Sequence, residues 1–163
     1  MKRKRSLRHA QAGFSLTELL IVVAIIGILA AVAVPRLLET LRTGRESAAI
    51  QTLRTVHNNQ AQFQATKQRF ATLKELNEAG QIDLNYANGT PVSGYMYTSA
   101  PEVTQDNYCV QATRQAPTSG SRDFNVIEDG TIRFVESKSP NPIPHGEGTP
   151  LAGAGAAAGT SAK

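Results

Sequence analysis

The stretch that decides the fold is residues 13–35, which read GFSLTELLIVVAIIGILAAVAVP. Within it, the 16 residues 19–34 are all apolar or Gly. The bases Lys2, Arg3, Lys4, Arg5 and Arg8 precede it with no acid among them. Its one carboxylate is Glu18, at the head of the apolar run. A charged side chain in a bilayer costs about 2.5–3.5 kcal/mol on insertion scales, so an acid at this position indicates a functional partner.

Three interpretations of this N-terminus follow from the residues. An ordinary secretory signal peptide has a basic start, an apolar segment and a small-residue cleavage site, which residues 31–33 (AVA) would supply. A plain membrane anchor would keep its bases on the cytoplasmic side. In the third interpretation the chain is cut after Gly13, so the new amino group of Phe14 lies close to Glu18. Between staggered neighbouring chains that amine and carboxylate would pair in a poorly screened environment and set the register of assembly.

The segment resembles the N-terminus of type IV prepilins and type II secretion pseudopilins over residues 13–35, and the basic leader belongs to the match. The resemblance implies that Gly13 is the last leader residue and that Phe14 becomes the N-methylated first residue. It also implies that Glu18 is the assembly residue. The implied partners are identical or related pilin subunits, a prepilin peptidase/methyltransferase and an inner-membrane assembly platform.

By this resemblance we expect a structural subunit of a bacterial type IV pilus-type filament. Its precursor would span the inner (cytoplasmic) membrane once, and the assembled filament would be periplasmic or extracellular. The alternatives are a pseudopilin of a type II secretion system and a single-pass anchored binding module that does not polymerise. Many type IV pilins close a C-terminal loop with a disulfide, which a chain with one cysteine cannot form. Major pseudopilins of secretion systems often carry a calcium-binding loop near the C-terminus. The C-terminal residues 140–163 contain one acid, Glu147, so neither subtype is matched cleanly.

The helical pattern continues beyond the apolar run, and it predicts one helix over residues 14–65. Apolar and inward-facing residues recur at three- and four-residue steps: Leu37, Leu41, Ala48, Ala49, Leu53, Val56, Gln60 and Phe63. Charged residues are expected on the remaining surface: Arg36, Glu39, Arg42, Arg45, Glu46 and Arg54. This divides the helix into a transmembrane and assembly half, residues 14–35, and an amphipathic half, residues 36–67. Gly27 and Pro35 are predicted to make the first half flexible, with a kink near Pro35.

Residues 68–139 read as a small globular part. A short helix is predicted at residues 73–79, because Thr72 and Glu75 have capping-box spacing and Gly80 is a suitable stop. Four strands are predicted, with a hairpin turn at Asp129-Gly130 before the last: residues 94–99, 107–113, 123–127 and 131–135. The fold class is therefore α+β, a long helix packed on a small antiparallel sheet. From residue 140 the Pro-, Gly- and Ala-rich composition predicts a disordered tail.

The bulk composition argues against several other functions. The chain has 17 Lys and Arg and 13 Asp and Glu, but without residues 1–13 the bases fall to 12 and the net charge becomes −1. The basic character thus belongs to the leader, and nucleic-acid binding is not indicated. The single cysteine, Cys109, is predicted to be buried. We find no catalytic motif and predict no enzyme, cofactor or metal site.

Overall fold

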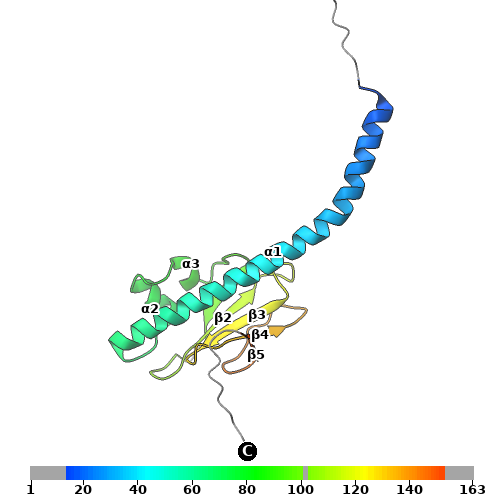
Figure 1. Ribbon diagram of the computed structural model, residues 1–163. Helices are drawn as coiled ribbons and strands as arrows, with labels where there is room; N and C mark the ends of the chain where they lie inside the picture. The colour runs from blue at the N-terminus through cyan, green and yellow to red at the C-terminus, as the bar shows by residue number, and fades with distance from the viewer. Residues whose placement is uncertain (1–13, 101–102, 153–163) are drawn as a thin grey trace, which may run out of the picture. The chain divides into compact units, whose positions relative to one another are not determined.

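The computed structural model describes residues 14–100 and 103–152. The described residues divide between Glu39 and Thr40 into two compact units, which are described separately below. The long helix α1, Leu16–Lys67, contributes to both of them (Figure 1). The other elements are α2 (Leu73–Glu78), α3 (Leu84–Ala87), β1 (Tyr95–Ser99), β2 (Cys109–Arg114), β3 (Arg122–Ile127), β4 (Ile132–Glu136) and β5 (Thr149–Pro150).

The described part of the first unit is the beginning of α1 with the residues just before it. The helix continues through Gly27 and Pro35, although an interior proline removes one hydrogen bond and an interior glycine costs about 1 kcal/mol. The predicted single helix is confirmed, and both of its ends lie two residues later than predicted, which is within the usual uncertainty of helix ends.

In the second unit, α1 buries one stripe of side chains against the sheet. The buried positions recur at alternating steps of three and four residues: Glu46, Ala49, Leu53, Val56, Gln60 and Phe63. The prediction of inward-facing residues is confirmed from Ala49 onward. It is wrong for Leu37 and Leu41, which are 58% and 47% exposed. The prediction that Glu46 lies on the surface is wrong, because this residue is only 5% exposed and belongs to the inward stripe.

The five strands form one antiparallel sheet in the order β1-β2-β3-β4-β5. In register, Tyr97 lies opposite Ala112, Ala112 opposite Phe124, and Phe124 opposite Phe134. Directly opposite residues share a face of the sheet, so this row joins α1 in the core. The α+β prediction is confirmed. The four predicted strands are found with ends shifted by one or two residues, and β5 is an addition to them.

The second face of the sheet is covered by residues 137–151, which we call the strap. The prediction of a disordered tail from residue 140 is wrong for this part. Ile143 is 2% exposed, and β5 pairs with β4. Polar side chains of the sheet bind the backbone of the strap: Gln111 donates to the Ile143 carbonyl at 2.8 Å and Asn125 to the Pro144 carbonyl at 2.9 Å. Composition failed here because hydrogen bonds, more than apolar burial, hold the segment. The end of the predicted tail, residues 153–163, lies outside the described residues.

The connection between α1 and the sheet follows its local sequence signals. Thr72 and Glu75 make the predicted capping box at the start of α2. Gly80 follows the helix with φ 72°, a conformation that glycine adopts without strain. The short helix α3 was not predicted. It begins at a cap in which Asp83 Oδ1 accepts the Asn85 N–H at 2.8 Å.

Candidate assembly segment

The first unit presents a continuous apolar surface. Every large apolar side chain in residues 14–34 is more than two-fifths exposed: Phe14, Leu16, Leu19, Leu20, Ile21, Val22, Val23, Ile25, Ile26, Ile28, Leu29, Val32 and Val34. Among the described residues, α1 is the one helix long and apolar enough to cross a membrane by length and composition. Soluble monomers rarely expose apolar patches larger than a few hundred Å². Lipid or other protein chains must therefore cover this surface.

Glu18 lies in the first turn of α1, at the head of this surface, and its side chain is exposed. A carboxylate in the first turn is favoured by the helix dipole by about 0.3–1 kcal/mol. Ser15 and Glu18 also have capping-box spacing, and the Ser15 carbonyl accepts the first bond, from Leu19 N–H at 3.2 Å. This spacing predicts a local role of Glu18 as a helix cap, besides the predicted intermolecular role. An amide at this position would keep the cap and lose the charge.

The remaining predicted site residues are placed as follows. Phe14 lies two residues before the start of the helix and is 79% exposed, whereas Gly13 lies outside the described residues. Cleavage between them and methylation of Phe14 stay predictions. Gly27 has open space where a Cβ would lie, so packing within the chain does not require glycine there. The flexibility predicted for Gly27 and Pro35 stays a prediction.

The second unit has an anchor that the sequence analysis missed. The Glu46 carboxylate accepts hydrogen bonds from Ser121 N–H at 2.7 Å and from Arg122 Nε and Nη2 at 2.8 and 2.6 Å. Burial alone would raise the pKa of Glu46, but these bonds outweigh it and hold the pKa below its usual value. The guanidinium of Arg122 also lies over the rings of Phe124 and Phe134. The sequence contained one signal for this burial: Glu46 lies three residues before Ala49 and so falls on the inward-facing stripe of the helix.

A second ion pair holds the strap. Arg114 and Asp123 pair at 3.1 Å, and both side chains are 1% exposed. Arg114 Nη2 donates to the Ser137 and Ser139 carbonyls, both at 3.1 Å. Asp123 Oδ2 accepts the Asn141 N–H at 3.1 Å. Asp123 begins the predicted strand of residues 123–127, and nothing local indicates that its partner lies nine positions earlier on the neighbouring strand.

The residues with potential for chemistry are dispersed in the described part of the chain. His57 Nδ1 lies 2.7 Å from the Tyr108 hydroxyl, and His145 Nε2 lies 2.9 Å from Glu128 Oε2. Cys109 is buried as predicted, and burial raises the pKa of its thiol to about 11. At neutral pH such a thiol is protonated and unreactive. No cluster of three or more potential metal-ligating side chains occurs among residues 14–100 and 103–152.

Comparison with known proteins agrees with the resemblance seen in the sequence. Residues 8–34 match the family model for the prokaryotic N-terminal methylation motif. The chain is also similar to the type IV major pilin protein PilA of Myxococcus xanthus (strain DK1622), with 42% identity over 59 residues. That alignment covers 36% of this chain and 27% of the Myxococcus protein. The resemblance to pilin-like proteins is confirmed, and the fold is consistent with it.

Proposed function

On the premise that this chain is type IV pilin-like and carries an N-terminal methylation motif, we propose that it is the structural subunit of a bacterial type IV pilus-type filament. The observation that carries the proposal is the exposed apolar surface of residues 14–34 with one carboxylate, Glu18, at its head. Other copies of the chain would cover this surface in the filament, and lipid would cover it before assembly. Apolar burial contributes about 25 cal/mol per Å², which would supply most of the cohesion.

The proposal includes processing of the chain. A membrane peptidase would cut between Gly13 and Phe14 and methylate the new amine, and an assembly platform in the inner membrane would receive the product. Glu18 would then pair with the amine of a neighbouring Phe14. Intact-mass spectrometry of the membrane form and of sheared filaments tests this step. We expect a chain that begins at a methylated Phe14. A chain that begins at Met1 or Val34 would contradict it.

Three Glu18 variants separate assembly from helix capping. Glu18→Gln keeps a side chain that can complete a capping box but removes the charge, whereas Glu18→Ala removes both. Glu18→Asp keeps the charge on a shorter side chain. We expect all three to insert into membranes, and the Gln and Ala variants to lose most of their filaments in shear preparations while the Asp variant retains a measurable yield. Normal filament yield from Glu18→Gln would show that the carboxylate acts only as a cap.

The type II secretion alternative shares the N-terminal segment, so it needs a separate test. The similarity to a type IV major pilin supports the proposal of a pilus subunit over that of a pseudopilin. Deletion of the gene in its native host is expected to remove surface filaments and leave secretion of exported enzymes unchanged. Loss of secretion with intact surface filaments would favour the pseudopilin. A membrane-anchored protein that never appears in sheared filaments would favour the anchored binding module.

A further inference from the structure

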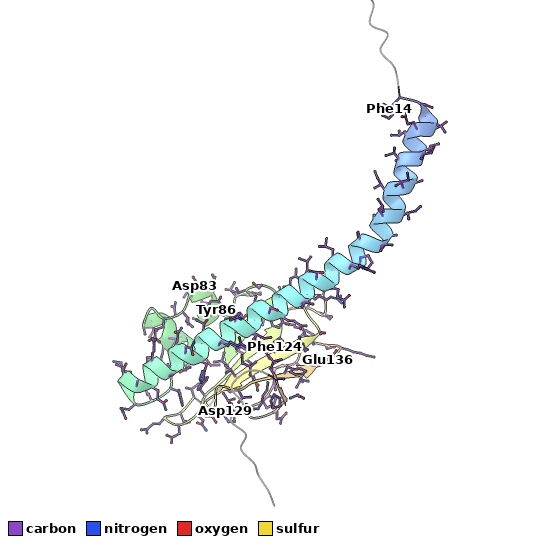
Figure 2. All side chains as sticks on the ribbon, in the orientation of Figure 1. Phe14, Asp83, Tyr86, Phe124, Asp129 and Glu136 are labelled. Carbon is purple, nitrogen blue, oxygen red and sulfur yellow. The ribbon has the colours of Figure 1, made fainter. Side chains whose placement is uncertain are left out.

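A hollow of about 300 Å³ lies in the second unit, between α1 and the segment that leads into α3. Its polar lining combines two side-chain amides, two hydroxyls and one carboxylate with an aromatic ring: Gln51, Gln81, Thr52, Thr55, Asp83 and Tyr86. Figure 2 shows Asp83 and Tyr86 close together on the connection that runs beside α1. We call this feature the Tyr86 hollow.

The walls of the Tyr86 hollow are held in place by bonds from outside it. Asn59 Nδ2 donates to the Gln81 carbonyl, and Asn77 Nδ2 donates to the Ile82 carbonyl, both at 2.8 Å. The ring of Tyr86 meets Tyr97 edge-on, with 5.1 Å between ring centroids. The backbone just before Asp83 and the ring of Tyr86 are therefore held in place before any ligand arrives. Binding to such a site loses little conformational entropy.

One acceptor in this wall lacks a partner. Gln81 Oε1 is buried and has no hydrogen bond within the described part of the chain. Buried polar groups are nearly always hydrogen-bonded, so an exception calls for an explanation. Because Gln81 lines the hollow, a rotation of its side chain would bring this oxygen to a bound hydroxyl donor.

The lining also restricts the ligand by charge and polarity. The residues that line the hollow include Asp83 and no Lys, Arg or His. Phosphates and carboxylates would be repelled, and a purely apolar ligand would offer no hydrogen bonds to the side-chain amides. A pyranose ring fits this combination, because its hydroxyls both donate and accept hydrogen bonds and its C–H face packs on an aromatic ring. The larger hollow of about 480 Å³ beside Cys109 also has two side-chain amides, Asn107 and Gln111, but its lining contains no side-chain hydroxyl or carboxylate.

We propose that the Tyr86 hollow binds one neutral pyranose residue of a glycan. The ring of Tyr86 takes the C–H face of the sugar, the amides of Gln51 and Gln81 and the hydroxyl of Thr55 bind its hydroxyls, and Asp83 excludes acidic sugars. This ligand site lies on the second unit, and the argument for it does not rest on the proposed function.

The test uses the full chain in a detergent whose headgroup contains no sugar. Three neutral probes are titrated with detection by saturation-transfer NMR: the methyl glycosides of glucose, mannose and N-acetylglucosamine. We expect at least one to bind saturably, with a dissociation constant on the order of 1 mM. Absence of saturable binding by all three would overturn the proposal.

Two variants locate the binding. Thr55→Val removes a hydroxyl that donates to the Gln51 carbonyl at 3.1 Å. Thr66→Val is the matched control, since Thr66 makes the same bond to Gln62 at 3.0 Å farther along α1. We expect binding about fivefold weaker in Thr55→Val, as the loss of one hydrogen bond implies, and unchanged in Thr66→Val. Equal affinity in both variants would overturn the assignment to this hollow.

The charge of Asp83 gives a second readout. Methyl glucuronide should bind the wild type at least about fivefold more weakly than methyl glucoside. Asp83→Asn should remove this difference, because asparagine still caps α3 but carries no charge. Equal binding of the two glycosides by the wild type would contradict the role given to Asp83.

Discussion

Among single residues, Glu46 makes a buried contact that its neighbours in the sequence do not predict. It joins α1 to the start of β3 across 75 positions of chain. Replacement by glutamine keeps the shape and removes the charge opposite Arg122. We expect Glu46→Gln to lower the free energy of unfolding of the second unit by about 2 kcal/mol, the typical value of hydrogen bonds to charged groups. Thermal unfolding of the full chain in detergent measures this. Glu78→Gln, at an exposed site, is the control and should change little.

The same carboxylate predicts a pH dependence. The pKa of Glu46 is lower in the folded chain than its usual value of 4.5. Its stabilising contribution is therefore present above pH 4.5, and it is lost as the pH falls from that value through the folded pKa. Unfolding followed by circular dichroism should show a loss of stability below pH 4.5 that is smaller in Glu46→Gln. An identical acid profile in both chains would assign the acid sensitivity to other carboxylates.

Replacing glycine by alanine is predicted to have opposite effects on stability at two positions of the second unit. A Cβ at Gly120 would lie 2.4 Å from the Tyr95 hydroxyl oxygen and 3.1 Å from Glu46 Oε1. Gly44 lies in α1 with open space around it. Gly120→Ala should destabilise the unit by about 1–3 kcal/mol through overpacking, and Gly44→Ala should stabilise the helix by about 0.5–1 kcal/mol. Chemical denaturation of both variants checks the prediction, and similar changes of the same sign would contradict it.

At the scale of elements, the strap completes the sheet. It covers one face of β2 and β3 where no helix lies, and Cys109 belongs to that face. The ion pair of Arg114 and Asp123 binds both the sheet and the strap backbone. We call this ion pair the clasp. It fastens the strap to the sheet noncovalently, in a chain whose single cysteine cannot form an internal disulfide.

Breaking the clasp should loosen the strap and expose the thiol beneath it. Asp123→Asn removes one charge of a buried pair, which costs about 3–5 kcal/mol when the other charge stays buried. We expect the rate at which a maleimide labels Cys109 in the folded full chain to rise at least about tenfold. Asp106→Asn, at an exposed position, should leave the rate unchanged. If Asp123→Asn unfolds the chain, Ser137→Ala is used instead, because it removes only one hydrogen bond to Arg114. This variant should also raise the labelling rate of Cys109, by a smaller factor.

For the whole molecule, the division into two units makes a prediction about folding. All members of the apolar core of the second unit lie at Ala49 or later. A chain that starts at residue 40 should therefore fold in water without detergent. We expect its midpoint of thermal unfolding to lie within a few degrees of that of the full chain in detergent, and its solubility to be much higher because residues 14–34 are gone. Aggregation or a molten state of the shortened chain would show that the second unit needs the first.

How far the sequence predicted the structure depended on how local each signal was. The short helix after Thr72 and the turn at Asp129-Gly130 follow from neighbouring residues, and both are found. The strands follow from alternation over five or six positions. The burial of Glu46, the clasp and β5 could not be predicted, because each depends on residues that are far apart in the chain and meet only after the sheet has formed.

The sequence by itself determined the N-terminal segment: a long helix, an apolar surface and one carboxylate at its head. Those properties depend on composition and helical period alone, so no partner within the chain was needed to read them. Only the tertiary structure decided that Glu46 anchors the helix and that Arg114 and Asp123 bind the strap. It also brought α1 and the α3 connection together around the Tyr86 hollow. Hydrogen bonds and charge pairs between distant residues gain their strength from burial, and burial is a property of the folded chain.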